Sequence, residues 1–145
     1  MLKIRRAQPN DIFPVIDLAF DTLPERYTPS IFNQFYESFP AGFFIALKNN
    51  SIIGFLIGIK TSPNIARILM LAVKEKNRKQ GIGTALLSQF LSEMKHQNVS
   101  RVELEVRTTN QGALDFYKTQ GFTLQDILHH FYQNGENAYS MRKDL

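Results

Sequence analysis

The sequence contains no cysteine among its 145 residues. Disulfide bonds are therefore excluded, as are metal sites built on thiolates. No apolar run reaches the length needed to span a bilayer, because the longest one, "SIIGFLIGI" at 51–59, is strand-sized and contains glycines. The N-terminal "MLKIRRAQP" lacks the long apolar stretch of a signal peptide. From these absences we expect a cytoplasmic protein that has no membrane partner.

The charge of the chain gives only a weak indication of a partner. There are 17 Lys and Arg against 13 Asp and Glu, for a net charge of +4. The positive residues are not gathered into an arm or onto one helix face, and no basic stretch alternates with aromatic residues, so we expect no direct nucleic-acid contact. A small anionic ligand and a solvated basic surface both explain the charge. No repeat or linker divides the chain, which predicts one domain over residues 1–145.

Hydrophobic periodicity predicts a protein of mixed α/β (α+β) class, a mixed sheet with helices on its faces. Thr28 is expected to cap the second helix with Pro29 at its first position, and Asn10 or Asp11 to cap the first helix. The stretch 65–74 is apolar on both faces, which is typical of a central covered strand. The predicted strands are 2–7, 42–48, 51–61, 65–74, 100–107, 122–132 and 138–143, and the predicted helices are 9–23, 28–39, the segment after 81, and 110–120.

A pair of glycines stands where one of these helices begins. The stretch "NRKQGIGTALL" at 77–87 passes from polar and basic residues through Gly81 and Gly83 into good helix formers. The first turn of a helix leaves its backbone N–H groups unpaired and carries about half a positive charge. Gly81 and Gly83 put no side chain between these amides and a ligand, and Arg78 and Lys79 add charge. The loop therefore predicts a phosphate or pyrophosphate site outside the dinucleotide-fingerprint and P-loop families.

The segment "RKQGIG" at 78–83 resembles the Arg/Gln-x-x-Gly-x-Gly/Ala motif of GCN5-related N-acetyltransferases, the GNAT superfamily. The segment "LEVRTTNQGALDFYKTQGF" at 104–122 is similar to the strand and helix that follow in this family. The early "LPERY" and the final "FYQNGENAYSMRKDL" resemble protein N-terminal acetyltransferases of the RimI and NatA catalytic-subunit types. The resemblance implies a mostly antiparallel mixed sheet of about six to seven strands flanked by four helices. It also implies a splay between the strand ending near Val73 and the strand starting near Arg101.

The resemblance further implies that acetyl-coenzyme A is the cofactor and that its acetyl group passes to an amine. In such enzymes the strand before the loop pairs its backbone with the pantetheine arm, while the loop holds the pyrophosphate. The alternative interpretation of Leu71–Val73 is a core strand without a ligand. The alternative for Asn110 is a helix cap alone. The cofactor-binding residues that the resemblance implies are Leu71, Ala72, Val73, Arg78, Lys79, Gln80, Gly81, Ile82, Gly83, Thr84, Asn110 and Tyr117.

Two catalytic tasks fall to side chains in the segments that carry the resemblance. Tyr117 is the candidate proton donor to the departing thiolate, because a phenol with a pKa near 10 stays protonated at neutral pH. Glu105 is the first candidate for the general base, with Glu25 in "LPERY" as a rival or partner. The alternatives are an aromatic core residue for Tyr117 and a solvated strand face for Glu105.

The substrate site is expected between two segments distant in the sequence. Glu25 and Tyr27 in the first and Tyr132 in the second are the candidate peptide contacts, while half-buried packing is the alternative for the tyrosines. Arg67 stands where some eukaryotic relatives have a catalytic Tyr, and Phe131 where many have a second Tyr. The adjacent histidines at 129 and 130 lack further ligands at suitable spacing, so no metal site is predicted.

The amine that would accept the acetyl group is best explained as a protein or peptide α-amine. Its pKa of about 7.7–8.0 leaves roughly a tenth of it neutral at pH 7, whereas a lysine amine at about 10.4 is neutral about four times in ten thousand. A lysine side chain, a small polyamine, and a non-catalytic acyl-coenzyme A sensor are the competing interpretations. The sequence leaves open whether an auxiliary subunit or the ribosome is a partner.

Overall fold

A computed structural model describes residues 1–145, and its order of elements matches the order predicted from the sequence. Three short 3-10 turns lie between the main elements, at Pro9–Asp11, Pro40–Gly42 and Glu75–Asn77. The strands are β1 (Leu2–Arg6), β2 (Phe43–Lys48), β3 (Ser51–Ser62), β4 (Ile65–Val73), β5 (Arg101–Arg107), β6 (Thr123–Leu128) and β7 (Ala138–Asp144). The helices are α1 (Ile12–Thr22), α2 (Ser30–Ser38), α3 (Ile82–His96) and α4 (Gln111–Thr119).

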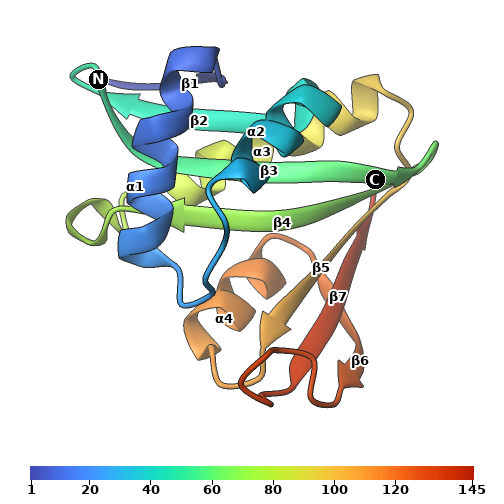
Figure 1. The fold of residues 1–145 in the computed structure, drawn as a ribbon. Coiled ribbons are helices and arrows are strands. Elements are labelled where there is room, and N and C mark those ends of the chain that lie inside the picture. Colours follow the sequence, from blue (N-terminus) through green and yellow to red (C-terminus); the bar gives the residue numbers. More distant parts are fainter.

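The seven strands form one sheet in the order β1-β2-β3-β4-β5-β7-β6. All neighbours are antiparallel except β4 and β5, which run parallel. Helices α1 and α2 pack on one face, where Val15 and Phe32 meet Phe43 and Phe55 of the sheet (Figure 1). Helices α3 and α4 share a second apolar core on the opposite face. The predicted mixed, mostly antiparallel sheet with four helices is thus confirmed.

The parallel pair β4 and β5 stays together over only three residues of each strand. Ile65–Arg67 pair with Arg101–Glu103, and beyond this point no register is formed. Figure 1 shows β5 and β7 swinging away from β4, with the α1–α2 connection hanging in front of the opening. The predicted splay is therefore present, and it divides the molecule into a four-stranded part and a three-stranded part.

Strand β4 contains a bulge inside the splayed region. Ile57 pairs with Met70 and Gly58 with Ile68, so Leu69 is the extra residue on β4. A bulge of this kind adds one residue, so the side chains that follow it point to the opposite faces of the sheet. Ile68 accordingly belongs to the α3 core, whereas Met70 belongs to the α1–α2 core. The expectation that this strand is covered on both faces is wrong in part, because every second residue along it, from Ile65 to Val73, is only half-buried.

Two local predictions also need correction. Pro29 is the N-cap residue of α2, which has no side-chain capping bond, and Thr28 contributes its backbone carbonyl to the Ile31 N–H at 3.0 Å. Strand β6 ends at Leu128 because His130 adopts a left-handed backbone with φ +54°, which a strand cannot contain. No helix of the chain combines the length and the apolar character needed to cross a lipid bilayer.

Candidate active site

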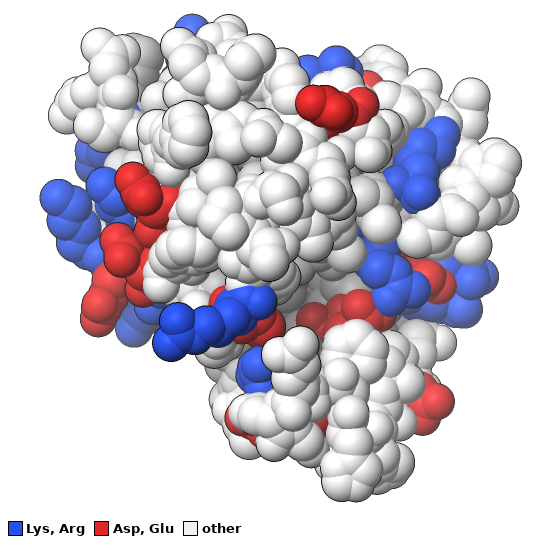
Figure 2. Space-filling view, viewed as in Figure 1, with Lys and Arg blue, Asp and Glu red and all other residues white.

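Two connected cavities lie in the opening between β4 and β5. We call the first the α3 groove; it has a volume of about 590 Å³ and runs along the start of α3. The second, the central pocket, has a volume of about 320 Å³ and lies beneath the α1–α2 connection. Figure 2 shows the hollow between the two parts of the molecule, with acidic and basic side chains along it. The residues that line both cavities are Leu23, Pro24, Leu71, Asn110, Ala113 and Tyr117.

The start of α3 presents free backbone amides to the α3 groove. The first bond of the helix runs from the Ala85 N–H to the Gly81 carbonyl at 3.0 Å, and no side chain caps this end. The N–H groups of residues 82–84 are therefore left for a ligand, and the helix dipole favours an anion there. Gly81 has φ +80°, a left-handed backbone conformation that glycine adopts without a steric penalty. Gly83 borders the groove, near Phe116.

The side chains of the loop contribute unequally to this groove. Arg78 and Lys79 line it, and the Arg78 guanidinium donates to the Val73 carbonyl at 3.1 Å. Thr84 also lines the groove and accepts from Gln120 at 3.2 Å, whereas Gln80 lies outside the lining. The sequence analysis assigned no role to Asn77, which is buried at the same edge and whose Oδ1 has no hydrogen-bond partner. The donor set fits the diphosphate and amide groups of coenzyme A.

Strand β4 supplies the floor where the two cavities meet. Leu71, Ala72 and Val73 line the α3 groove, and Leu71 lines the central pocket as well. These residues pair with β3 on one side, but no strand pairs with them on the other because β5 has diverged. Their backbone is therefore open to an extended ligand arm on that side.

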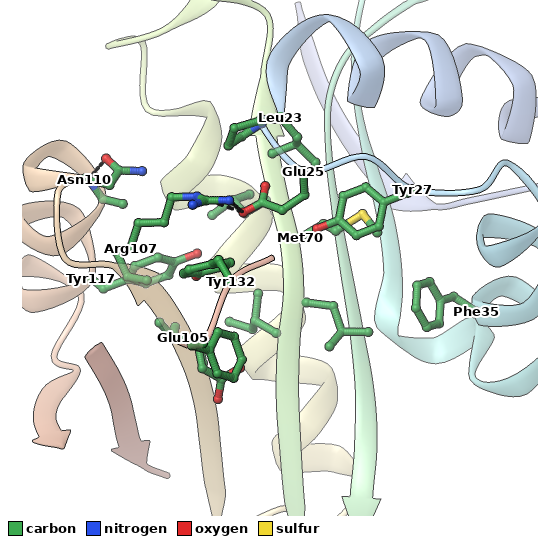
Figure 3. A pocket seen from close by; sticks show the side chains of 18 residues that line it. Leu23, Glu25, Tyr27, Phe35, Met70, Glu105, Arg107, Asn110, Tyr117 and Tyr132 are labelled. Atoms are coloured by element: carbon green, nitrogen blue, oxygen red, sulfur yellow. Dashed lines mark hydrogen bonds and ion pairs between the residues drawn. The ribbon is translucent and has the colours of Figure 1, made fainter. Parts of the chain in front are cut away.

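Tyr117 of α4 stands at the junction of the cavities. Its ring is buried edge-on against Phe116 and Phe122, at centroid distances of 5.1 and 5.4 Å. Its hydroxyl makes no hydrogen bond within the chain and faces the cleft in Figure 3. Burial raises the pKa of Tyr117 well above its usual value, so the hydroxyl keeps its proton. Asn110 caps α4 as predicted, because its Oδ1 accepts from the Ala113 N–H at 3.1 Å.

Glu105 reaches the central pocket from the polar face of β5 and is already ion-paired. Its side chain is only 14% exposed, and its Oε2 accepts from Arg67 of β4. The same guanidinium donates to Glu103 at 3.3 Å. In the sequence, this cluster is indicated only by Arg67, a lone cation in an otherwise apolar strand. A partly buried cation of this kind requires an anionic partner.

A second arginine joins the two segments that flank the central pocket. Arg107, at the end of β5, lies within 3.1 Å of Glu25 from the α1–α2 connection and donates to Asn134 of the β6–β7 connection at 3.2 Å. Its guanidinium also stacks on the Tyr132 ring, 3.9 Å from the centroid. Figure 3 shows Glu25, Arg107 and Tyr132 converging, with Tyr27 beyond them. No role for Arg107 was predicted from the sequence.

The two tyrosines predicted to contact substrate both remain proton donors. Burial, reinforced by the charge of Glu25 and opposed by Arg107, raises the pKa of Tyr27 to about 12. Burial raises the pKa of Tyr132 to about 12 as well, with Glu25 adding to the effect and Arg107 opposing it. Apolar side chains close the far end of the pocket, among them Phe35 and Met70. The pocket thus combines apolar walls with a few polar groups near Tyr117, an arrangement typical of a small acceptor site.

Comparison with known proteins places this geometry in a family. Residues 12–122 match the model of the Acetyltransferase (GNAT) family. An N-alpha-acetyltransferase of Sulfurisphaera tokodaii is 33% identical over 155 residues, covering 99% of this chain and 93% of the relative. The crystal structure of Ard1 from Thermoplasma volcanium has a TM-score of 0.96 and 38% identity, covering 99% of this chain and 97% of that one. The structure of Arabidopsis thaliana Naa50 in complex with the bisubstrate analogue CoA-Ac-MVNAL has a TM-score of 0.86 and 25% identity, covering 99% of each chain. The chain therefore belongs to the GNAT acetyltransferase family.

Proposed function

We propose that this chain is a single-domain N-acetyltransferase, which moves the acetyl group of acetyl-coenzyme A to the α-amine at the N-terminus of a protein or peptide. The observation that carries the proposal is the junction of the two cavities at Leu71 and Tyr117. A ligand held in the α3 groove and an amine held in the central pocket would meet at this shared part of the lining. The N-alpha-acetyltransferase of Sulfurisphaera tokodaii, similar over nearly its whole length, supports the same activity.

The cofactor end of the reaction depends on the α3 groove. The amides of residues 82–84 and the cations Arg78 and Lys79 receive the diphosphate, while the open backbone of Leu71–Val73 pairs with the pantetheine arm. A backbone N–H of this strand also stabilises the oxyanion that forms on the acetyl carbonyl. Asn110 holds the start of α4 beside both cavities.

The chemical step needs one proton donor and one route for the proton of the amine. The amine nitrogen attacks the thioester carbonyl carbon, the carbon–sulfur bond breaks, and Tyr117 donates its proton to the departing thiolate. The proton that the amine loses finally restores the phenol, so the protons balance. Glu105 is the first candidate to receive the proton of the amine, and Glu25 the second. Each carboxylate is already bound to an arginine, so the pocket holds no unpaired carboxylate. This favours an amine that is partly neutral at pH 7 over lysine.

The acceptor end is shaped to receive a chain terminus. Glu25 and Tyr27 from one side and Tyr132 from the other flank the pocket, and Arg107 ties these two sides together. We propose that the tyrosine hydroxyls donate to the first carbonyls of the substrate, since both groups keep their protons. Near the pocket, Glu25, Glu103 and Glu105 outnumber Arg67 and Arg107, which favours a cationic terminus during binding.

A panel of acceptors tests the proposal directly. Purified chain and acetyl-coenzyme A are incubated with a tetrapeptide library bearing free α-amines, with lysine peptides whose α-amine is blocked, and with spermidine. The products are quantified by mass spectrometry. We expect kcat/KM to favour free α-amines by about a hundredfold or more, in line with the difference in neutral amine. Activity confined to lysine or spermidine would exclude an N-terminal acetyltransferase. No product at all, with tight coenzyme A binding, would indicate a sensor.

A further inference from the structure

Arg67 is the one charged side chain of β4, and the proposed chemistry makes no use of it. The other residues of this strand are apolar. Its guanidinium contacts two carboxylates of the neighbouring strand, Glu105 through Nη1 and Glu103 through Nη2. Arg67 and Glu103 are also the last residues of β4 and β5 that face each other in register. The arginine therefore stands at the point where the two strands part.

The two oxygens of Glu105 have different surroundings. Oε2 is held by Arg67, whereas Oε1 makes no hydrogen bond and is not sealed from solvent. Glu105 lines the central pocket, but Arg67 does not. The guanidinium thus holds one oxygen of the carboxylate and leaves the other oxygen without a partner in the chain.

The groups around Glu105 leave Arg67 as its only bonded partner. Arg107, next on the same face of β5, is engaged by Glu25, Asn134 and Glu136. The other polar groups lining the pocket, on the α1–α2 connection, on α4 and on the β6–β7 connection, make no bond to Glu105; they are Glu25, Tyr27, Asn110, Tyr117 and Tyr132. Without Arg67, nothing in the chain fixes the direction of this carboxylate.

We propose that Arg67 is a positioning residue that acts through Glu105 and aims its free oxygen at the amine of the substrate. This proposal rests on the proposed acetyl-transfer function and assigns the orientation of the acceptor amine to the Arg67–Glu105 pair. A side chain held in one direction loses less entropy when the amine binds, so the fixed carboxylate favours acceptor binding and attack. The cofactor side, built on α3 and on β4 beyond the bulge, does not depend on this contact.

A double-mutant cycle tests the coupling between the two residues. The variants are Arg67→Met, Glu105→Gln and the double variant, measured with the acceptor that wild-type enzyme uses best in the panel. We expect Arg67→Met to lower kcat/KM for the acceptor about tenfold and to leave the KM for acetyl-coenzyme A within about twofold. The double variant should be no worse than Glu105→Gln alone. Arg67→Lys, which keeps one donor, should recover part of the loss.

Arg101→Met is the matched control. Arg101 lies on the same face of β5, one step before the splay, and pairs with Glu103 and Asp144 without touching Glu105. We expect it to keep kcat/KM within about twofold while its melting temperature falls as much as that of Arg67→Met. Additive losses in the double variant, or a rise in the KM for acetyl-coenzyme A with an unchanged acceptor KM, would overturn the proposal in favour of a purely structural clasp. The cycle can be run with any accepted amine, so its failure is distinct from failure of the α-amine assignment.

Discussion

We propose that the two cavities of this molecule recognise their ligands by different means. The α3 groove relies on backbone, namely the free amides of residues 82–84 and the unpaired edge of β4. The central pocket relies on side chains, among them two arginine–glutamate pairs and three tyrosines. Backbone groups are present whatever the residue, so the first site depends on conformation, whereas the second depends on side-chain identity. A substitution should therefore affect the kinetics of one substrate or the other, except at the junction.

The largest effect is expected at the junction itself. Tyr117→Phe should lower kcat by about a hundredfold or more, the usual contribution of a proton donor. Coenzyme A affinity and thermal stability should change little, because the ring packing stays and the hydroxyl has no partner in the chain. Steady-state kinetics at saturating substrates and calorimetric titration of coenzyme A provide the two measurements. Tyr139→Phe, a half-buried tyrosine outside both cavities, is the control. A kcat reduced less than threefold would remove Tyr117 from the chemistry.

The next effect separates backbone conformation from side-chain identity. Gly81→Ala places a Cβ on a residue with φ +80°, which costs about 1–2 kcal/mol of strain or shifts the loop. We expect coenzyme A to bind about tenfold more weakly, since hydrogen bonds to a charged ligand contribute about 1.5–3 kcal/mol. Gly83→Ala is the matched control, because its φ is not in the left-handed region and its Cβ would lie 3.5 Å from Phe116, an ordinary contact. Equal losses in both variants would show that space, not conformation, decides this site.

A smaller effect is expected in the central pocket. Tyr27→Phe removes a protonated hydroxyl and should raise the peptide KM about threefold to tenfold, because a neutral hydrogen bond contributes about 0.5–1.5 kcal/mol. The KM for acetyl-coenzyme A should stay the same. Tyr36→Phe, on α2 outside both cavities, should change neither value. If Tyr27→Phe altered the acetyl-coenzyme A KM instead, the division between the two cavities would be wrong.

The smallest effect concerns pH. The pKa of Tyr27 and that of Tyr132 are about 12, so both hydroxyls keep their protons well past pH 10. We expect kcat/KM for a peptide to rise as its α-amine loses its proton near pH 8, and then to stay level up to pH 10. Because these folded pKa values exceed the unfolded value near 10, the free energy of unfolding should fall as pH rises from 10 to 12. A rate that declines from pH 9 would indicate a tyrosine of ordinary acidity.

The sequence was sufficient for the order of strands and helices because these depend on local patterns, whereas the mostly antiparallel sheet and its splay were implied by the family resemblance. Periodicity placed the strands and helices, and two glycines with basic neighbours marked the loop. The charged clusters were harder to predict because they join distant segments: Arg107 and Glu25 are 82 positions apart, and nothing local indicates their contact. The bulge at Leu69 adds one residue to a strand without changing its composition, so the reversal of faces after it had no sequence signal. Arg67 alone gave a hint, as an isolated charge among apolar neighbours.

The divergence of β4 from β5 has a consequence for the solution behaviour of the protein. Unpaired strand edges usually lie at the perimeter of a sheet, where they invite pairing with other chains and aggregation. Here the splay places a second pair of edges in the interior, between α4 and the α1–α2 connection. A narrow, extended ligand can pair with such an edge, whereas the bulkier sheet of another molecule is kept from it by these flanking segments. We infer that this unpaired strand edge stays available to an extended ligand but is protected from pairing with the sheet edge of another molecule.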